Sequence, residues 1–281
     1  MRVALLTFLL INCTDPPDMF KLNIGPRFNT GIRRTPRPLA FVFAGESNSG
    51  GGAWNSDALA AEVAARPSVQ VMDLYSGTFD FEDLDIGYNN TVDHFAVTTN
   101  PTWVPSLHDI RVHGMELALA NAVDVSGVAD RDVVYLVKTG QGASTIAQWY
   151  VGGTYWTKFL QRTSAAKTQL QQPQWIVWYS LGLNDIAAGT PVATWKTAVL
   201  EHLGRIQTAL PGCVIVMTEF QSIPIDNPSY DTAIQEIAAS SPTIVSINTA
   251  GAGTVNGNHW SYSGFKNTVV PRMIAATLGL I

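Results

Sequence analysis

A serine follows the first buried segment of the sequence, at a turn flanked by glycines. Residues 39–45, LAFVFAG, form a continuous apolar run typical of a parallel strand that is buried on both faces. The sequence GESNSG overlaps the end of this run and contains Ser47. A hydroxyl group at such a turn can act as a nucleophile, and its backbone N–H can point at the same ligand. Taken alone, the segment is better explained as an ordinary Ser/Gly turn.

Three further segments could contribute chemistry after other apolar runs. Gly142 lies in the turn after residues 132–137, where a backbone N–H can approach a ligand closely. Asn184 follows residues 175–181, and its side-chain amide can donate to an oxyanion. His259 precedes the last helical segment, and histidine is the usual base that activates a serine. Each has a plainer alternative: a glycine-rich connector, a helix cap and a structural histidine, respectively.

Strand and helix patterns alternate from residue 39 to residue 281, which predicts one α/β domain. We expect a three-layer α/β/α sandwich, flavodoxin-like, with a parallel sheet of about five strands. Because ligands bind outside the carboxyl ends of such strands, the four segments should meet at one edge of the sheet. The strands are predicted over residues 39–45, 69–75, 132–137, 175–181 and 213–220, with a candidate sixth over 243–248.

Together the Ser, Gly, Asn and His segments resemble the sequence blocks of the SGNH hydrolases, also called GDSL-like esterases. The resemblance is greatest to the carbohydrate acetylesterase branch, which includes sialate O-acetylesterases and acetylxylan esterases. That branch has Gly-Gln-Ser-Asn where this chain has GESN, and Gly-x-Asn-Asp where it has GLND. The second block, GASTIAQW from Gly142 to Trp149, and Gly264 after the histidine also fit. The resemblance covers residues 39–278.

The resemblance implies hydrolysis of an ester, with an O-acetyl group on a carbohydrate as the expected substrate. Ser47 would attack the acyl carbon to form an acyl-enzyme while His259 accepts its proton. The backbone N–H groups of Ser47 and Gly142 and the amide of Asn184 would hold the oxyanion. The reaction implied in this way uses no metal ion and no organic cofactor.

The chain departs from the family pattern at several positions. Asn256 stands where family members have an aspartate three residues before the histidine. We hypothesise that Asn256 accepts the Nδ1–H of His259 and supports a Ser–His dyad. The alternative is a carboxylate from the loop after the fifth strand, Asp226 or Asp231. In addition, Glu46 replaces glutamine and Ala143 replaces the commoner glycine.

Two other functions stay open at this stage. An SGNH lipase or thioesterase would need an apolar groove for a longer acyl chain, and the Asp- and Asn-rich segment 76–110 argues against one. A non-catalytic carbohydrate-binding relative would not need all of the serine, glycine, asparagine and histidine. Four tryptophans near the expected site could stack against a sugar or pack inside the protein: Trp54, Trp103, Trp149 and Trp260.

The charge and hydropathy of the sequence argue against two classes of partner, nucleic acid and the interior of a membrane. The net charge is −5 and the 17 Lys and Arg residues are scattered, which argues against nucleic acid. No apolar run reaches the roughly 18 residues that a membrane-spanning helix requires.

The pair His108 and His113 is a weak candidate for a metal site because its spacing does not suit a helix face. The expected partner is therefore a small-molecule or polysaccharide acetyl ester, and the sequence does not indicate an oligomeric state.

Residues 1–38 form an N-terminal arm outside the resemblance. After Arg2, an apolar stretch leads to Cys13, as in a short secretion signal that ends at a lipid-attachment cysteine. Translation from Met19 is the alternative. The first interpretation predicts a secreted or envelope-attached protein and the second a cytoplasmic one. Residues 14–38, rich in Pro, Arg, Asn and Gly, are expected to be a linker.

Overall fold

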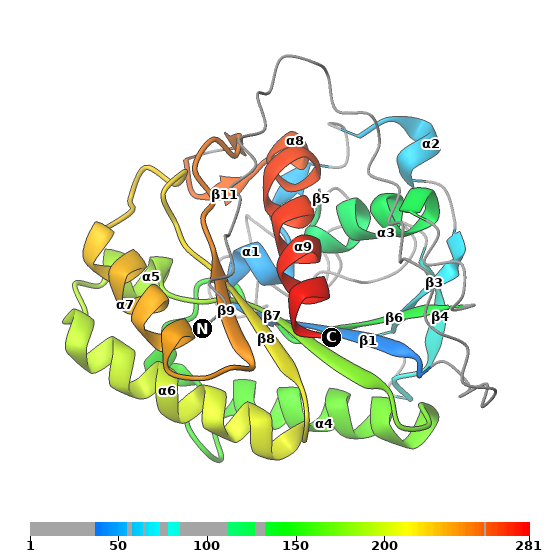
Figure 1. Cartoon of the computed structure of the whole chain (residues 1–281), viewed down its shortest axis with the longest axis horizontal. Helices are drawn as coiled ribbons and strands as arrows, with labels where there is room; N and C mark the ends of the chain where they lie inside the picture. The colour runs from blue at the N-terminus through cyan, green and yellow to red at the C-terminus, as the bar shows by residue number, and fades with distance from the viewer. Residues whose placement is uncertain are drawn as a thin grey trace, which may run out of the picture.

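The main structural feature is a seven-stranded sheet. The computed structural model describes residues 37–54, 58–63, 66–73, 78–84, 112–126, 133–255 and 257–281. Across the sheet the strands follow the order β4-β3-β6-β1-β7-β8-β9 (Figure 1). Their bounds are β1 (Leu39–Gly45), β3 (Arg66–Met72), β4 (Phe81–Leu84), β6 (Val134–Lys138), β7 (Gln174–Ser180), β8 (Val214–Thr218) and β9 (Ile244–Ile247).

The sheet is larger than expected and its strand order differs. All neighbouring strands pair in parallel except β4, which pairs antiparallel with β3 at one edge. The six parallel strands, numbered along the chain, run 2-3-1-4-5-6, whereas a flavodoxin-like sheet runs 2-1-3-4-5. The predicted flavodoxin-like order was therefore wrong, whereas the candidate sixth strand over residues 243–248 is confirmed as β9. The sequence FEDL of β4 carries two exposed acidic residues, so it lacks the apolar signal of a buried strand.

Helices cover both faces of this sheet, which confirms the predicted three layers. Figure 1 shows α3 (Met115–Ser126) and α9 (Val270–Leu280) on one side and α4 (Thr154–Gln169) and α6 (Val192–Ala209) on the other. The remaining helices are α1 (Ser47–Gly50), α2 (Ala60–Val63), α5 (Leu183–Ala187), α7 (Pro228–Ala239), α8 (Tyr262–Gly264), the 3₁₀ turn η2 (Ile146–Gln148) and the π-helical turn η3 (Phe265–Val269). Two small antiparallel sheets pair β2 (Ala53–Trp54) with β5 (Val112–His113) and β10 (Thr254–Val255) with β11 (His259–Trp260).

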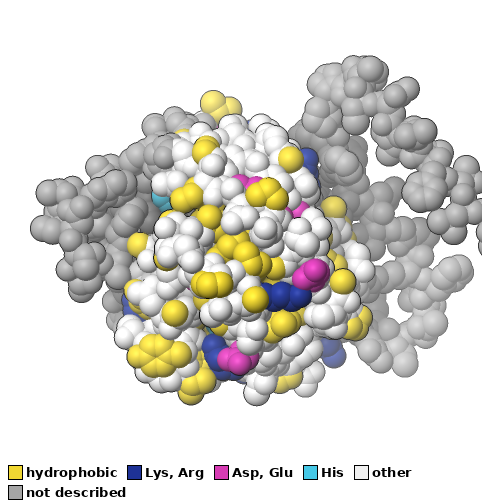
Figure 2. Space-filling view, turned by 90° about the vertical axis from the view of Figure 1, so that its left-hand side faces the viewer, with side chains coloured by type: hydrophobic (Ala, Val, Ile, Leu, Met, Phe, Trp, Pro, Cys, Tyr) yellow, Lys and Arg dark blue, Asp and Glu magenta, His cyan; other side chains and the backbone are white. Residues whose placement is uncertain are grey.

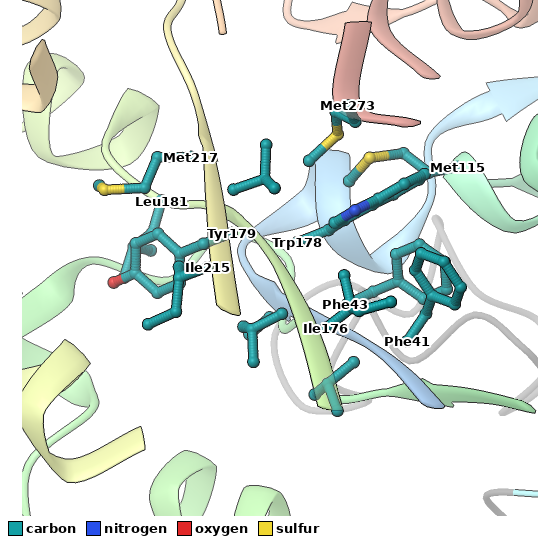
Figure 3. Close-up of a cluster of buried hydrophobic side chains, with 14 of the residues drawn as sticks. Phe41, Phe43, Met115, Ile176, Trp178, Tyr179, Leu181, Ile215, Met217 and Met273 are labelled. Carbon is teal, nitrogen blue, oxygen red and sulfur yellow. The ribbon is translucent and has the colours of Figure 1, made fainter. Parts of the chain in front are cut away.

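An aromatic cluster holds the centre of the sheet to one helical layer. The Trp178 ring meets Phe41 and Phe43 edge to face, with centroids 5.2 and 5.6 Å apart. Met115 and Met273 lie beside this indole in Figure 3, from α3 and α9, while Tyr179 lies on the opposite face of β7. Burying each such side chain contributes about 2 kcal/mol. The central strands are thus rigidly packed beneath the edge where they end.

The turn from β1 into α1 requires glycine at its first position. Gly45 has φ of +128° and is paired in register with Ser180 on β7. A Cβ atom at Gly45 would lie 1.9 Å from the carbonyl oxygen of Ser180. Only glycine therefore lets β1 lie this close to β7 and then turn directly into Ser47.

Figure 2 shows the distribution of charged side chains on one face of the described residues. There the basic side chains of the described residues lie apart from one another, some of them next to acidic ones. Such a distribution fits the scattered charges of the sequence. None of the helices in the described ranges combines the length and the apolar character that crossing a membrane requires.

Candidate active site

Three of the residues singled out in the sequence line one cavity. Ser47, Asn184 and His259 come from three distant parts of the chain and face a cavity of about 180 Å³. Gly142 is buried directly before Ala143, which also lines it. Asn256 lies outside the described residues. The full lining comprises Glu46, Ser47, Ala143, Leu183, Asn184, Ala187, Ile225, Asn258 and His259.

Ser47 is the first residue of α1 and is fixed from both sides. The backbone N–H of Glu46 donates to the Ser180 carbonyl at 2.8 Å, and the hydroxyl of Ser49 donates to the Ala44 carbonyl at 2.7 Å. Ser47 is 9% exposed, and the cavity is where its side chain meets open space. Its backbone is therefore held in place while its side chain faces the cavity.

Glu46 accepts hydrogen bonds from the segment that carries Asn184. Its carboxyl oxygens accept from the backbone N–H groups of Gly182 (2.8 Å), Leu183 (2.6 Å) and Asn184 (3.1 Å). The side-chain amide of Asn184 donates to the same carboxyl group. Burial raises the pKa of Glu46 to about 7, although the backbone hydrogen bonds oppose this shift. Because an amide nitrogen carries two N–H groups, Asn184 has a second one available for a ligand.

The loop with Gly142 is tied to the same segment through Asp185. Its carboxylate accepts from the backbone N–H of Ile146 at 2.9 Å. Within the loop, Ala143 has φ of +57°, a left-handed conformation that costs a residue with a Cβ about 1–2 kcal/mol. In this left-handed conformation Ala143 lies on the cavity wall. The hydrogen bond to Asp185 fixes the position of the Gly142 loop relative to the segment that carries Asn184.

His259 lies on β11, which pairs with β10 so that His259 stands opposite Val255. Its ring rests against Gly52: a Cβ atom there would lie 2.7 Å from both Cγ and Cδ2 of the imidazole. Burial lowers the pKa of His259, because desolvation penalises the charged ring. A neutral imidazole at neutral pH is the form that can accept a proton.

The two alternative carboxylates are engaged away from the cavity wall. Asp231 accepts from the backbone N–H of Phe220 at 2.7 Å and shares a hydrogen bond with Asp226. Burial raises the pKa of both groups, that of Asp231 to about 7. Their neighbour Ile225 lines the cavity, whereas neither aspartate is among its lining residues. These contacts favour a structural role for the pair.

The remaining candidates from the sequence are buried or lie outside the described residues. His113 is buried with its ring edge-on to Tyr262, and burial lowers its pKa to about 4. His108 is outside the described residues, and the part of the chain that is described contains no group of three metal-binding side chains. Trp149 and Trp260 are both 0% exposed, so of the two alternatives these tryptophans pack inside the protein and offer no face to a sugar. Trp103 and the side chain of Trp54 are not described.

Sequence reasoning did not anticipate the contributions of Glu46, Leu183, Ala187 and Ile225 to the cavity. Glu46 stands out in the sequence only because it occupies the position of the glutamine in the family's Gly-Gln-Ser-Asn block. The three apolar residues carry no chemical signal in the sequence, and only the fold places them at the site.

The chain belongs to a known esterase family. The model of the family "carbohydrate esterase, sialic acid-specific acetylesterase" matches residues 39–268. This range contains Ser47, Gly142, Asn184 and His259. The protein is thus a hydrolase of the carbohydrate esterase class that acts on esters. No curated protein matches the sequence.

Solved structures show the same fold at low sequence identity. A protein from Arabidopsis thaliana superposes with a TM-score of 0.64 at 15% identity, over 87% of this chain and 99% of that one. The structure of NanS gives a TM-score of 0.62 at 13% identity, over 88% of this chain and 98% of its own. At such identities these likenesses establish the fold alone.

Proposed function

We propose that the protein is a serine esterase that removes O-acetyl groups from a carbohydrate. The observation that carries this proposal is the cavity that joins Ser47, Asn184 and His259. Ser47 Oγ attacks the acyl carbon while His259 takes its proton, which gives a tetrahedral intermediate. His259 then protonates the sugar oxygen as the bond from this oxygen to the acyl carbon breaks, which leaves a covalent acetyl-enzyme. A water molecule that gives a proton to His259 attacks the acetyl-enzyme, and acetate leaves as Ser47 recovers its proton.

The oxyanion of the tetrahedral intermediate is held by the Ser47 and Gly142 backbone N–H groups and by Asn184. The hydrogen bond from Asn184 to Glu46 supports this role, because it fixes the plane of the amide before substrate binds. Donors fixed in advance are worth more than mobile ones, since no reorganisation is needed when charge develops.

The size and lining of the cavity favour a short acyl group. Its volume of about 180 Å³ is small, and Leu183, Ala187 and Ile225 form an apolar part of the wall. An acetyl methyl group fits such a wall, and each further methylene must find additional space. This argues against the lipase or thioesterase alternative.

Acetate release from O-acetylated sugars and hydrolysis of 4-nitrophenyl esters of increasing chain length test the proposal. We expect turnover of acetyl esters, a fall in kcat/KM with each added pair of methylenes, and almost complete loss in Ser47→Ala with an unchanged circular dichroism spectrum. Equal rates for Ser47→Ala and the parent would refute the mechanism. A preference for octanoyl over acetyl esters would support the lipase alternative, and a parent without any turnover would support the carbohydrate-binding one.

A further inference from the structure

The side chain of Asn48 joins the nucleophile turn to both residues that flank His259. Its Nδ2 donates to the carbonyl oxygen of Asn258 at 3.2 Å, and its Oδ1 accepts from the backbone N–H of Trp260 at 3.1 Å. Asn48 is 0% exposed. These contacts bridge more than 200 positions of sequence, from the residue after Ser47 to both sides of the histidine.

The side-chain amide of Asn48 pairs with the backbone of β11 in the way that a neighbouring strand would. Along an extended strand, backbone groups at alternate residues point to the same side. Residues 258 and 260 therefore present a carbonyl and an N–H to one side of β11, and the Asn48 amide pairs with both. On its other side β11 pairs with β10, where His259 is opposite Val255. The backbone around His259 is thus held along both of its edges.

A second contact from the same turn supports the ring itself. Gly52 lies under the imidazole so closely that any side chain would collide with Cγ and Cδ2. Gly52 is in turn fixed because its N–H donates to the His113 carbonyl at 3.0 Å. Residues 48 and 52 therefore hold the backbone and the ring of His259 relative to Ser47.

We propose that Asn48 is a positioning residue that sets the place of His259 relative to Ser47, with Gly52 as the surface on which the imidazole rests. This inference deepens the proposed function and rests on it for its kinetic consequence. In this chain the family's aspartate is replaced by Asn256, so a neutral amide occupies the position that usually orients the base. Asn48 holds His259 through the backbone of residues 258 and 260, so its contribution does not depend on the residue at position 256.

The kinetic test compares Asn48→Ala with the parent and with Thr277→Val. Thr277 on α9 accepts from the Trp178 indole and donates to the Met273 carbonyl, so its loss removes buried hydrogen bonds remote from the cavity. We expect both variants to lose stability, about 1–3 kcal/mol for the groups left unsatisfied. Only Asn48→Ala should lose kcat, by about 10²-fold with KM nearly unchanged, because a displaced base impairs chemistry more than binding.

Asn48→Asp is the second variant: it keeps the acceptor for Trp260, and at a pH at which the new carboxyl group is ionised it has no donor for Asn258. It should fold and show a reduced kcat as well. Gly52→Ala should also reduce kcat, since its methyl group displaces the imidazole.

An NMR readout of the His259 ring separates this inference from the proposed function, because it requires no substrate. Imidazole signals of labelled protein are assigned by comparison with His259→Gln. In Asn48→Ala we expect the His259 signals to shift and its pKa to move back toward the ordinary value as the ring gains solvent, whereas Thr277→Val leaves them in place. Unchanged His259 signals in Asn48→Ala, or an unchanged kcat in an active parent background, would overturn the inference. If the parent proves inactive, the esterase mechanism fails and the NMR result alone decides the role of Asn48.

Discussion

The side-chain amide of Asn184 donates a hydrogen bond to the buried carboxyl group of Glu46, the residue directly before Ser47. Asn48, directly after Ser47, binds the strand of His259. The residues on either side of the serine thus each hold one of its expected partners. One short turn therefore organises the site, which makes its polar residues the most informative ones to change.

The ionisation of Glu46 predicts a pH-dependent stability. Its pKa is raised from 4.5 to about 7 in the folded protein, so the folded state binds more protons than the unfolded state between these values. The contribution of Glu46 is full below the lower value and is lost as pH rises through the folded pKa, on the order of 3 kcal/mol in total. Thermal unfolding should show the parent losing Tm between about pH 5 and pH 8, and Glu46→Gln should have a flatter profile.

The matched control is Glu236→Gln, which changes an exposed carboxyl group on α7. It should retain the parent's dependence of Tm on pH. Parallel profiles for Glu46→Gln and the parent would mean that Glu46 does not titrate in this range.

Asn184 should contribute to kcat rather than to KM. In Asn184→Ala the side-chain donor to the oxyanion is lost, and the loss of one such donor costs roughly 10²–10³ in kcat. Steady-state kinetics on an acetyl ester measure both constants, with Thr277→Val as the control for general destabilisation. A raised KM at normal kcat would instead assign Asn184 to substrate binding.

The sequence was sufficient to predict the three α/β/α layers and the edge of the sheet at which the candidate site lies. Ser47, Asn184 and His259 follow recognisable elements, and parallel strands bring their carboxyl ends together. The contacts of Glu46 and Asn48 could not be predicted, because each joins positions more than 130 residues apart and depends on how the loops pack. The sequence indicated that Trp149 and Trp260 lie near the loops of the site. It could not indicate the direction of their side chains, which point into the core.

pH–rate profiles can show which side chain supports the imidazole of His259, Asn256 or one of the two aspartates. If Asn256 supports the ring as proposed, Asn256→Asp adds a charge that favours the protonated imidazole and raises its pKa. Activity requires the neutral ring, so the acid limb of kcat/KM should move to higher pH. Asp226→Asn and Asp231→Asn should lower stability but leave this acid limb in place, because the two side chains share a hydrogen bond and Asp231 also accepts from the Phe220 N–H. Abolished activity in either aspartate variant, with a silent Asn256→Ala, would assign the support to that carboxylate.

Ile225 should limit the length of the acyl group. It lines the cavity together with Ala187, and Ile225→Ala removes three carbon atoms from the apolar wall. Burial of each methylene is worth about 0.8 kcal/mol, so two further methylenes of a butyryl group could gain about tenfold. The ratio of kcat/KM for butyrate to that for acetate should rise by this factor in the variant. A ratio equal to that of the parent would place the acyl group elsewhere in the cavity.

Gly264 should be required for the position of the loop that carries His259. A Cβ atom at Gly264 would lie 2.1 Å from the carbonyl oxygen of Gly253, the residue directly before β10, so the two segments pack backbone to backbone. Gly264→Ala must push this loop away, because the obstructing atom belongs to the backbone and cannot rotate aside. We expect a loss of stability of about 1–3 kcal/mol and a lower kcat.

The control for Gly264→Ala is Gly204→Ala on α6, where an added Cβ meets no atom within 4 Å. In a helix interior, alanine is favoured over glycine by roughly 0.5–1 kcal/mol, so this variant should be slightly more stable than the parent and equally active. Chemical denaturation and kcat on an acetyl ester measure the two effects on the same preparations. If Gly264→Ala were as stable and active as Gly204→Ala, the close approach of the Gly253 and Gly264 backbones would not be needed to hold His259 at the site.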